Sequence, residues 1–166
     1  MGDGRVKVEV RIFPDEAPSL LRWLYERNRK LVARDAAHRR DPFAVMHGLQ
    51  KGSIKYIQSD KREHWKDRSE VLRDGGGDCE DLASAITAEL NEALYRPGFG
   101  ASFAGKPPPL PPPLEGEKGN IEFAWGSNDG SEAVTVVYSP RKGLYHVLTW
   151  TPTWGLIDPS VAGGMS

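Results

Sequence analysis

A glycine run, an acidic residue and the chain's single cysteine stand together in Gly75-Gly76-Gly77-Asp78-Cys79-Glu80-Asp81-Leu82-Ala83. The apolar residues that follow recur at helical steps of three and four: Leu82, Ala85, Ile86, Leu90 and Leu94. This spacing is typical of an amphipathic helix, and aspartate is a good N-cap residue. The sequence therefore predicts a helix from about Asp78 to Tyr95, with Cys79 in its first turn.

The first turn of a helix favours a reactive cysteine. Unpaired backbone N–H groups and the helix dipole stabilise negative charge there, and the thiolate is the nucleophilic form of cysteine. The neighbours Asp78, Glu80 and Asp81 act in the opposite direction, because their negative charges disfavour a thiolate. The sequence leaves the net effect on Cys79 open. The competing interpretation is an inert, buried cysteine.

The composition is that of an ordinary globular domain. The 166 residues include 39% hydrophobic and 27% charged residues, and 22 Lys and Arg against 23 Asp and Glu give a net charge of -1. This balance gives no sign of a nucleic-acid or membrane partner. The start of the chain lacks the apolar core of a signal peptide, and a single cysteine excludes an internal disulfide. We expect a cytoplasmic protein.

The first half of the chain reads as one strand, two helices and a short extended piece. The alternation of Val6, Val8, Val10 and Ile12 predicts a strand over Arg5 to Phe13. Helical patterns and cap residues predict helices over Ser19 to Arg34 and over Asp41 to Gly52, the second with Pro42 at its first position. Ile54 to Ile57 reads as extended. The stretch from Gln58 to Asp74 is polar, apart from Trp65.

A proline-rich segment separates the halves. Residues 96–119 contain Pro97, Pro107 to Pro109 and Pro111 to Pro113. The part from Lys106 to Leu114 favours a polyproline II conformation. We interpret it as an inserted loop, and the alternative is a binding segment for the aromatic groove of a protein partner.

The last third is rich in strands. Four apolar, β-branched or aromatic runs are separated by turn residues: Ile121 to Trp125, Ala133 to Tyr138, Leu144 to Trp150 and Trp154 to Ile157. Short turns between such runs predict an antiparallel meander. Helices followed by a sheet indicate a single α+β domain over residues 1–166.

Two further residues complete a candidate catalytic group. His146 lies within one predicted strand, and Asp158 follows the next strand. If those strands pair, Asp158 is able to orient the His146 ring, whose other nitrogen then faces Cys79. A nucleophilic cysteine needs such a base and such an orienting group.

These pieces together resemble the transglutaminase-like cysteine peptidase superfamily, in small members from bacteria and bacteriophages. The resemblance rests on Gly-Gly-Asp-Cys-Glu-Asp-Leu-Ala before a helix, Tyr-His-Val on a strand and the ending Ile-Asp-Pro-Ser-Val-Ala-Gly-Gly-Met, and it covers roughly Asp41 to Met165. It implies a papain/transglutaminase-like fold, in which the cysteine helix packs on an antiparallel sheet that carries the histidine and the aspartate. It also implies a location in a bacterial or phage-infected cell, or in a virion.

By this resemblance Cys79 is the nucleophile, His146 the general base and acid, and Asp158 the orienting residue of a catalytic triad. The implied activity is a thiol hydrolase, a peptidase or amidase, that cleaves an acyl-amide bond in a protein or peptide through a thioester, without a cofactor or metal. The family often stabilises the oxyanion with an aromatic or amide side chain upstream of the cysteine. Trp65 and Tyr56 are both candidates, and the sequence does not choose between them.

Three alternatives remain open. The chain is a non-catalytic structural or interaction module that kept the fold, for example in a phage particle, or an acyltransferase that crosslinks proteins through a lysine amine. A zinc site built from Cys79, His146 and Asp158 is the third, but no paired-ligand spacing supports it. The other histidines, His38, His47 and His64, are expected at the surface.

Overall fold

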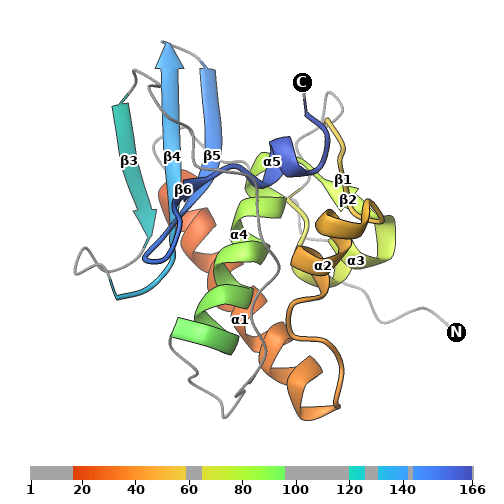
Figure 1. The fold of residues 1–166 in the computed structure, drawn as a ribbon. Helices are drawn as coiled ribbons and strands as arrows, with labels where there is room; N and C mark the ends of the chain where they lie inside the picture. Colours follow the sequence, from red (N-terminus) through yellow and green to blue (C-terminus); the bar gives the residue numbers. More distant parts are fainter. Residues whose placement is uncertain (1–16, 59–64, 96–119, 126–130, 142–143, 166) are drawn as a thin grey trace, which may run out of the picture.

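The computed structural model describes residues 17–58, 65–95, 120–125, 131–141 and 144–165, and they form a mixed α+β structure (Figure 1). The helices of this part are α1 (Ala17–Ala37), α2 (Ala44–Lys51), α3 (Arg68–Asp74), α4 (Cys79–Leu90) and α5 (Pro159–Ala162). The strands are β1 (Lys55–Tyr56), β2 (Gly76–Gly77), β3 (Asn120–Trp125), β4 (Val134–Arg141), β5 (Leu144–Thr151) and β6 (Gly155–Ile157). A π-helical turn, Asn91–Tyr95, continues α4.

The larger sheet confirms the predicted meander. Its four strands are antiparallel and lie in the order β3-β4-β5-β6. Tyr138 on β4 pairs with His146 on β5, and Thr149 on β5 pairs with Ile157 on β6. The smaller sheet, which the sequence did not predict, is a parallel pair of β1 and β2, so the glycines before Cys79 lie beside the Tyr56 backbone.

Helix α4 is at the centre of the molecule. It contacts α1, α2, α3, α5, β4 and β5. In Figure 1 the sheet of β3 to β6 lies on one side of α4, and α2 and α3 lie on the other. All of its residues from Asp81 to Leu90 are buried. The polar residues among them are shielded from water and therefore need hydrogen-bond partners inside the protein.

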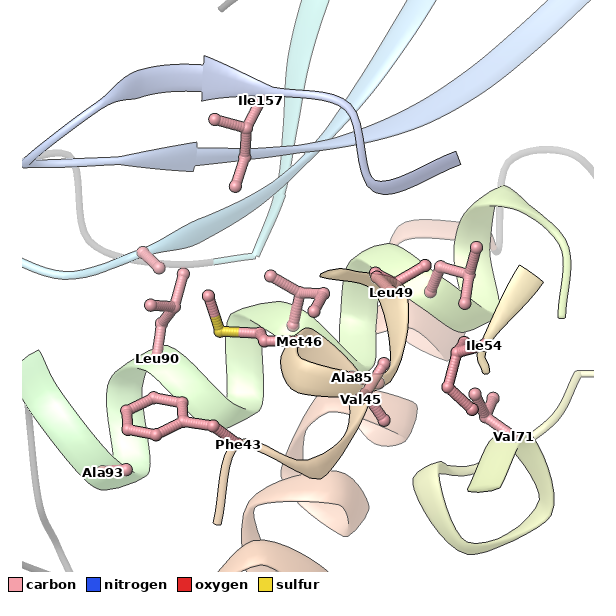
Figure 2. Packing of buried hydrophobic residues seen from close by; sticks show 13 residues of the cluster. Phe43, Val45, Met46, Leu49, Ile54, Val71, Ala85, Leu90, Ala93 and Ile157 are labelled. Atoms are coloured by element: carbon pink, nitrogen blue, oxygen red, sulfur yellow. The ribbon is translucent and has the colours of Figure 1, made fainter. Parts of the chain in front are cut away.

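The main hydrophobic core fills the space between α4 and its neighbours (Figure 2). Side chains from α2, α3 and α4 meet there with Ile54, next to β1, and Ile157 of β6. A second cluster lies between α1, α4 and the sheet, and it comprises Leu21, Ala83, Val137 and Val147. Burial of such side chains contributes roughly 1.5–3 kcal/mol each. The helix that carries Cys79 is therefore fixed on two sides.

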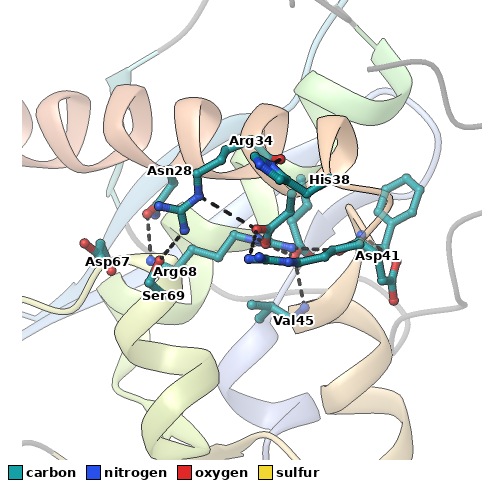
Figure 3. A network of polar contacts seen from close by, with 12 residues as sticks. Asn28, Arg34, His38, Asp41, Val45, Asp67, Arg68 and Ser69 are labelled. Carbon is teal, nitrogen blue, oxygen red and sulfur yellow. Dashed lines mark hydrogen bonds and ion pairs between the residues drawn. The ribbon is translucent and has the colours of Figure 1, made fainter. Parts of the chain in front are cut away.

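A buried polar network joins the four larger helices (Figure 3). Arg68 of α3, 1% exposed, bonds Glu89 of α4 through Nε at 2.7 Å and also pairs with Asp35 of α1. Glu89 accepts the backbone N–H groups of Val45 and Met46 at the start of α2, at 2.9 and 3.0 Å. A buried charge of this kind requires partners. Arg68 has three: the carboxylates of Glu89 and Asp35, and the Asp41 carbonyl at 3.0 Å.

The structure corrects two sequence predictions. The polar stretch after Gln58 contains α3, whose N-cap Asp67 accepts the backbone N–H of Glu70. Helix α2 begins at Ala44 rather than at Asp41 or Pro42, and Asp41 accepts the backbone N–H of Phe43 before the helix. The first-turn amides of α2 are bound instead by Glu89, a partner distant in sequence.

The remaining expectations divide into those that are confirmed and those that the structure does not reach. The helix at Ser19 to Arg34 is present as the longer α1, and the helix at Asp78 to Tyr95 is present as α4 with its π-helical turn. The expected strand at Arg5 to Phe13 and the proline-rich segment, with its Lys106 to Leu114 part, lie outside the described residues, as does His64.

Candidate active site

Cys79 is the first residue of α4. The N-cap Asp78 and Asp81 form a capping box, in which each side chain accepts the backbone N–H of the other residue, at 3.4 and 3.2 Å. Such a box fixes the first turn of a helix. The glycines before it allow β2 to lie against β1, since a Cβ at Gly76 would meet the Lys55 carbonyl oxygen at 2.1 Å. The sulfur is thereby held at a defined place, beside the sheet.

The surroundings of the sulfur favour the neutral thiol. Burial is the largest cause that raises the pKa of Cys79, and the negative charge of Glu80 raises it further. Cys79 Sγ–H donates to Glu80 Oε2 at 3.1 Å. The backbone N–H of Val147 acts in the opposite direction and lowers the pKa. Burial and the adjacent carboxylate outweigh the helix N-terminus, so the balance that the sequence left open falls on the side of the neutral thiol.

His146 and Asp158 lie side by side, as their spacing predicted. His146 Nε2 is 2.7 Å from Asp158 Oδ2. The register explains the contact: Thr149 pairs with Ile157, so Asp158 comes opposite Leu148 and is a diagonal neighbour of His146 on the same face. The other oxygen, Oδ1, accepts the N–H groups of Ser160 and Val161 at 3.0 and 3.3 Å and caps α5. The aspartate that holds the imidazole is therefore fixed itself.

The cysteine and the histidine come from elements that pack together. Cys79 packs against the cluster that contains Val147, the residue after His146, and the Val147 N–H is close enough to the sulfur to lower its pKa. In the described part of the chain, the thiol is hydrogen-bonded to Glu80 and not to the His146 ring. Nδ1 is the ring nitrogen that Asp158 does not occupy.

Trp65 lies at the same cluster. It is half-buried against the residues that also contact Cys79, and its indole N–H is one of two buried side-chain groups without a hydrogen-bond partner among the described residues. The position of this segment is fixed by Asp81, whose Oδ1 accepts the Lys66 backbone N–H at 2.7 Å. Burial and the charge of Asp78 raise the pKa of Asp81. The sequence singled out Trp65 but gave no sign of the hydrogen bond between Lys66 and Asp81 that fixes its segment.

Tyr56 marks a strand that joins the two halves of the site. On one side of β1, the N–H groups of Lys55 and Ile57 donate to the carbonyls of Gly75 and Gly77, at 3.0 and 2.8 Å. On the other side, Tyr56 N–H donates to the Gly163 carbonyl at 2.8 Å. Strand β1 thus links the glycine segment that precedes Cys79 to Gly163, just after α5. Burial raises the pKa of Tyr56, and the negative charges of Asp78, Glu80 and Asp158 raise it further.

The other histidines form no second site with a nucleophile in the described residues. His38 is exposed, and its ring contacts the Arg34 carbonyl at 2.8 Å. His47 is half-buried, pairs with Asp41 and packs edge-on against Phe43. Within the described ranges, no three Cys, His, Asp or Glu side chains are grouped in a way that would hold a metal ion.

Comparison with known proteins gives no family assignment. A scan against models of known families, a search of curated proteins and a search of solved structures each return no match for this chain. Among the helices of the described segments, none combines the length and the apolar character that crossing a bilayer requires.

Proposed function

We propose that the protein is a cysteine-dependent acyl-amide hydrolase, a peptidase or amidase of the transglutaminase-like type. The observation that carries the proposal is the 2.7 Å contact of His146 with Asp158, on a strand whose next residue lies at the Cys79 sulfur. A helix that begins with the nucleophile and packs on an antiparallel sheet with the histidine also supports the papain/transglutaminase-like class. The aspartate lies just after β6, at the N-cap of α5.

In this mechanism, Cys79 attacks the carbonyl carbon of the substrate and His146 Nδ1 takes the thiol proton. The tetrahedral intermediate places negative charge on the former carbonyl oxygen. We assign two donors to it: the backbone N–H of Cys79, in the helix turn that leaves amides unpaired, and the Trp65 indole N–H, which has no hydrogen-bond partner among the described residues. His146 then gives the proton to the departing amine, which leaves a thioester on Cys79. Water, activated by His146, releases the acid and restores the thiol.

A protein or peptide amide is the substrate class of this proposal, and the proposed location is the cytoplasm of a bacterial or phage-infected cell, or a virion. If a lysine amine replaces water as the acceptor, the same site crosslinks proteins. A product assay with a labelled primary amine distinguishes the two, because only acyl transfer incorporates the label. The role of the segment from Lys106 to Leu114, as a loop or as a partner-binding element, stays a prediction.

One observation favours a second candidate, a non-catalytic structural or interaction module. The thiol bonds Glu80 and has a raised pKa, whereas a poised nucleophile is usually closer to a thiolate. The pH dependence of Cys79 alkylation by iodoacetamide separates the two candidates. A Cys–His pair predicts faster alkylation in the wild type than in His146→Ala over the neutral range. Equal, slow alkylation in both proteins would contradict the enzyme and favour the module.

The matched control for this test is His38→Ala, because His38 is exposed and its ring contacts the backbone carbonyl of Arg34 at the end of α1. It should leave alkylation unchanged. Trp65→Phe tests the proposed oxyanion donor, since it keeps the ring against the cluster and removes the N–H. Hydrolysis of an amide substrate should fall by about 10²–10³ in kcat, while alkylation of the thiol, which forms no oxyanion, should stay near the wild-type rate.

A further inference from the structure

We propose that Glu80 holds the Cys79 thiol in its protonated resting state by accepting the Sγ–H hydrogen bond, so that Glu80 competes with His146 for control of the nucleophile. The inference rests on the proposed role of Cys79. It goes further, because it assigns an acid–base role to a residue outside the triad. The direct observation is the contact of Cys79 Sγ with Glu80 Oε2 at 3.1 Å.

The two side chains are placed to share one proton. They occupy consecutive positions in the first turn of α4, where the capping box of Asp78 and Asp81 fixes the backbone. His146 is directed to Asp158 through Nε2. In the structure, therefore, the thiol is held by a carboxylate and not by the imidazole.

The charges around Glu80 favour retention of the shared proton by the Cys79–Glu80 pair. Asp78, Cys79 and Asp81 lie beside Glu80 at the start of α4. On β1, burial raises the pKa of Tyr56, and the charges of Glu80 and of Asp158, beside α5, raise it further. These neighbours carry negative charge or none, and His146 on β5 is held by Asp158. Lys66, which contacts the glycine stretch, is bound to Asp74 and to the Gly76 carbonyl.

The pKa shifts agree with this geometry. Burial, followed by the charge of Asp78, raises the pKa of Glu80 to about 7. The same carboxylate raises the pKa of Cys79. Two groups that interact in this way titrate as a pair, and their protons leave in two separate steps.

The proton balance explains the consequence. Transfer of the proton from Sγ to Oε2 breaks the S–H bond, forms an O–H bond, and leaves a thiolate beside a neutral carboxylic acid, so the pair keeps one negative charge. Loss of the last proton places two negative charges at contact distance in a buried site, which is unfavourable. Glu80 therefore holds the nucleophile in its protonated pair until His146 or a bound substrate changes the balance.

The test measures the pH midpoint of Cys79 alkylation in Glu80→Gln and Glu80→Ala. Both changes remove the charge, and the alanine introduces no new donor to the sulfur. We expect the midpoint to fall by at least about one pH unit, which is about a tenfold gain in the thiolate fraction at neutral pH. Glu70→Gln on α3 is the control carboxylate and should leave the midpoint unchanged. Circular dichroism verifies that each variant is folded.

The same substitutions in a His146→Ala background separate this inference from the proposed function. A lower midpoint in both backgrounds supports the role of Glu80. An unchanged or higher midpoint, or slower alkylation, in folded Glu80→Gln and Glu80→Ala would overturn it. If His146→Ala has no effect in either background while the Glu80 variants still lower the midpoint, the Cys–His mechanism fails and the inference about Glu80 stands.

Discussion

Asp158 uses its two carboxylate oxygens for two different tasks. Oδ2 holds His146, and Oδ1 accepts two amides of the first turn of α5. The side chain is almost fully buried, so both contacts are protected from water. Loss of this residue therefore affects the site and the local fold together, and a single substitution to alanine does not distinguish them.

A pair of substitutions separates the two tasks of Asp158. Asparagine caps helices about as well as aspartate but has no charge to stabilise an imidazolium. We expect Asp158→Ala to lower the free energy of unfolding by about 1 kcal/mol more than Asp158→Asn, as for other lost caps. Both should slow amide hydrolysis strongly. Urea denaturation and a kinetic assay provide the two readouts. Equal activity of Asp158→Asn and the wild type would contradict the orienting role.

At the scale of single residues, the sequence predicted positions better than ionisation. The order and spacing of His146 and Asp158 were sufficient to predict their contact, because strand pairing is a short-range rule. The state of the Cys79 thiol was not predictable. It depends on burial and on the rotamer of Glu80, and the helical spacing of apolar residues predicts neither.

At the scale of elements, β1 is short but connects both parts of the site. Its hydrogen bonds run to β2 on one side and to Gly163, just after α5, on the other. Gly163 has no room for a side chain there: a Cβ would lie 2.5 Å from the Tyr56 nitrogen and 3.1 Å from the Lys55 carbonyl carbon. Both neighbours are backbone atoms, so α5 itself would have to move.

We expect Gly163→Ala to destabilise the protein by about 1–3 kcal/mol, the usual cost of overpacking. It should also reduce the effect of His146 on Cys79 alkylation, because a displaced α5 carries Asp158 with it. Val161→Ala, an exposed position in the same helix, is the control and should change neither. Thermal unfolding and the alkylation assay check both parts. A normal melting temperature for Gly163→Ala would contradict the close packing of β1 against α5.

Some elements were predictable from local patterns and others were not. Helices α1 and α4 and the four strands of the meander have clear periodicity, and turn residues flank the strands. The missed helix α3 had a signal, since Asp67 precedes Glu70 by three residues, which is a capping pattern. The β1–β2 pair had none, because each strand has two residues and the pairing joins distant segments.

At the scale of the whole molecule, Arg68 and Glu89 join helices that the sequence could only place one by one. Burial raises the pKa of Glu89, and the Arg68 charge lowers it again. Without Arg68, Glu89 and Asp35 would be left as buried charges with a missing partner. The α+β class was predictable from the order of helices and strands, but this network was not.

Arg68→Met should therefore lower the free energy of unfolding by about 3–5 kcal/mol at pH 7. A carboxyl whose folded pKa is raised stabilises the fold at low pH, and this stability is lost as the pH rises through that pKa. Because the variant raises the pKa of Glu89 further, its deficit against the wild type should shrink from pH 7 to pH 5. Urea denaturation at both values measures this.

The control is Arg73→Met on the same helix, whose exposed ion pairs with Glu70 and Asp74 are screened by water and should contribute little to stability. Equal losses for Arg68→Met and Arg73→Met would show that the network contributes no more than surface charges do.

The bond between Tyr56 and Gly163 also bears on how the protein is made. The meander joins neighbours in sequence and is able to form fast once its strands are present, whereas this bond closes a very long loop, which is slow. A ribosome delivers residue 56 long before residue 163. We therefore expect a nascent chain to carry Cys79 without its assembled neighbours until Gly163 has emerged, so that catalysis by the proposed triad is withheld during synthesis.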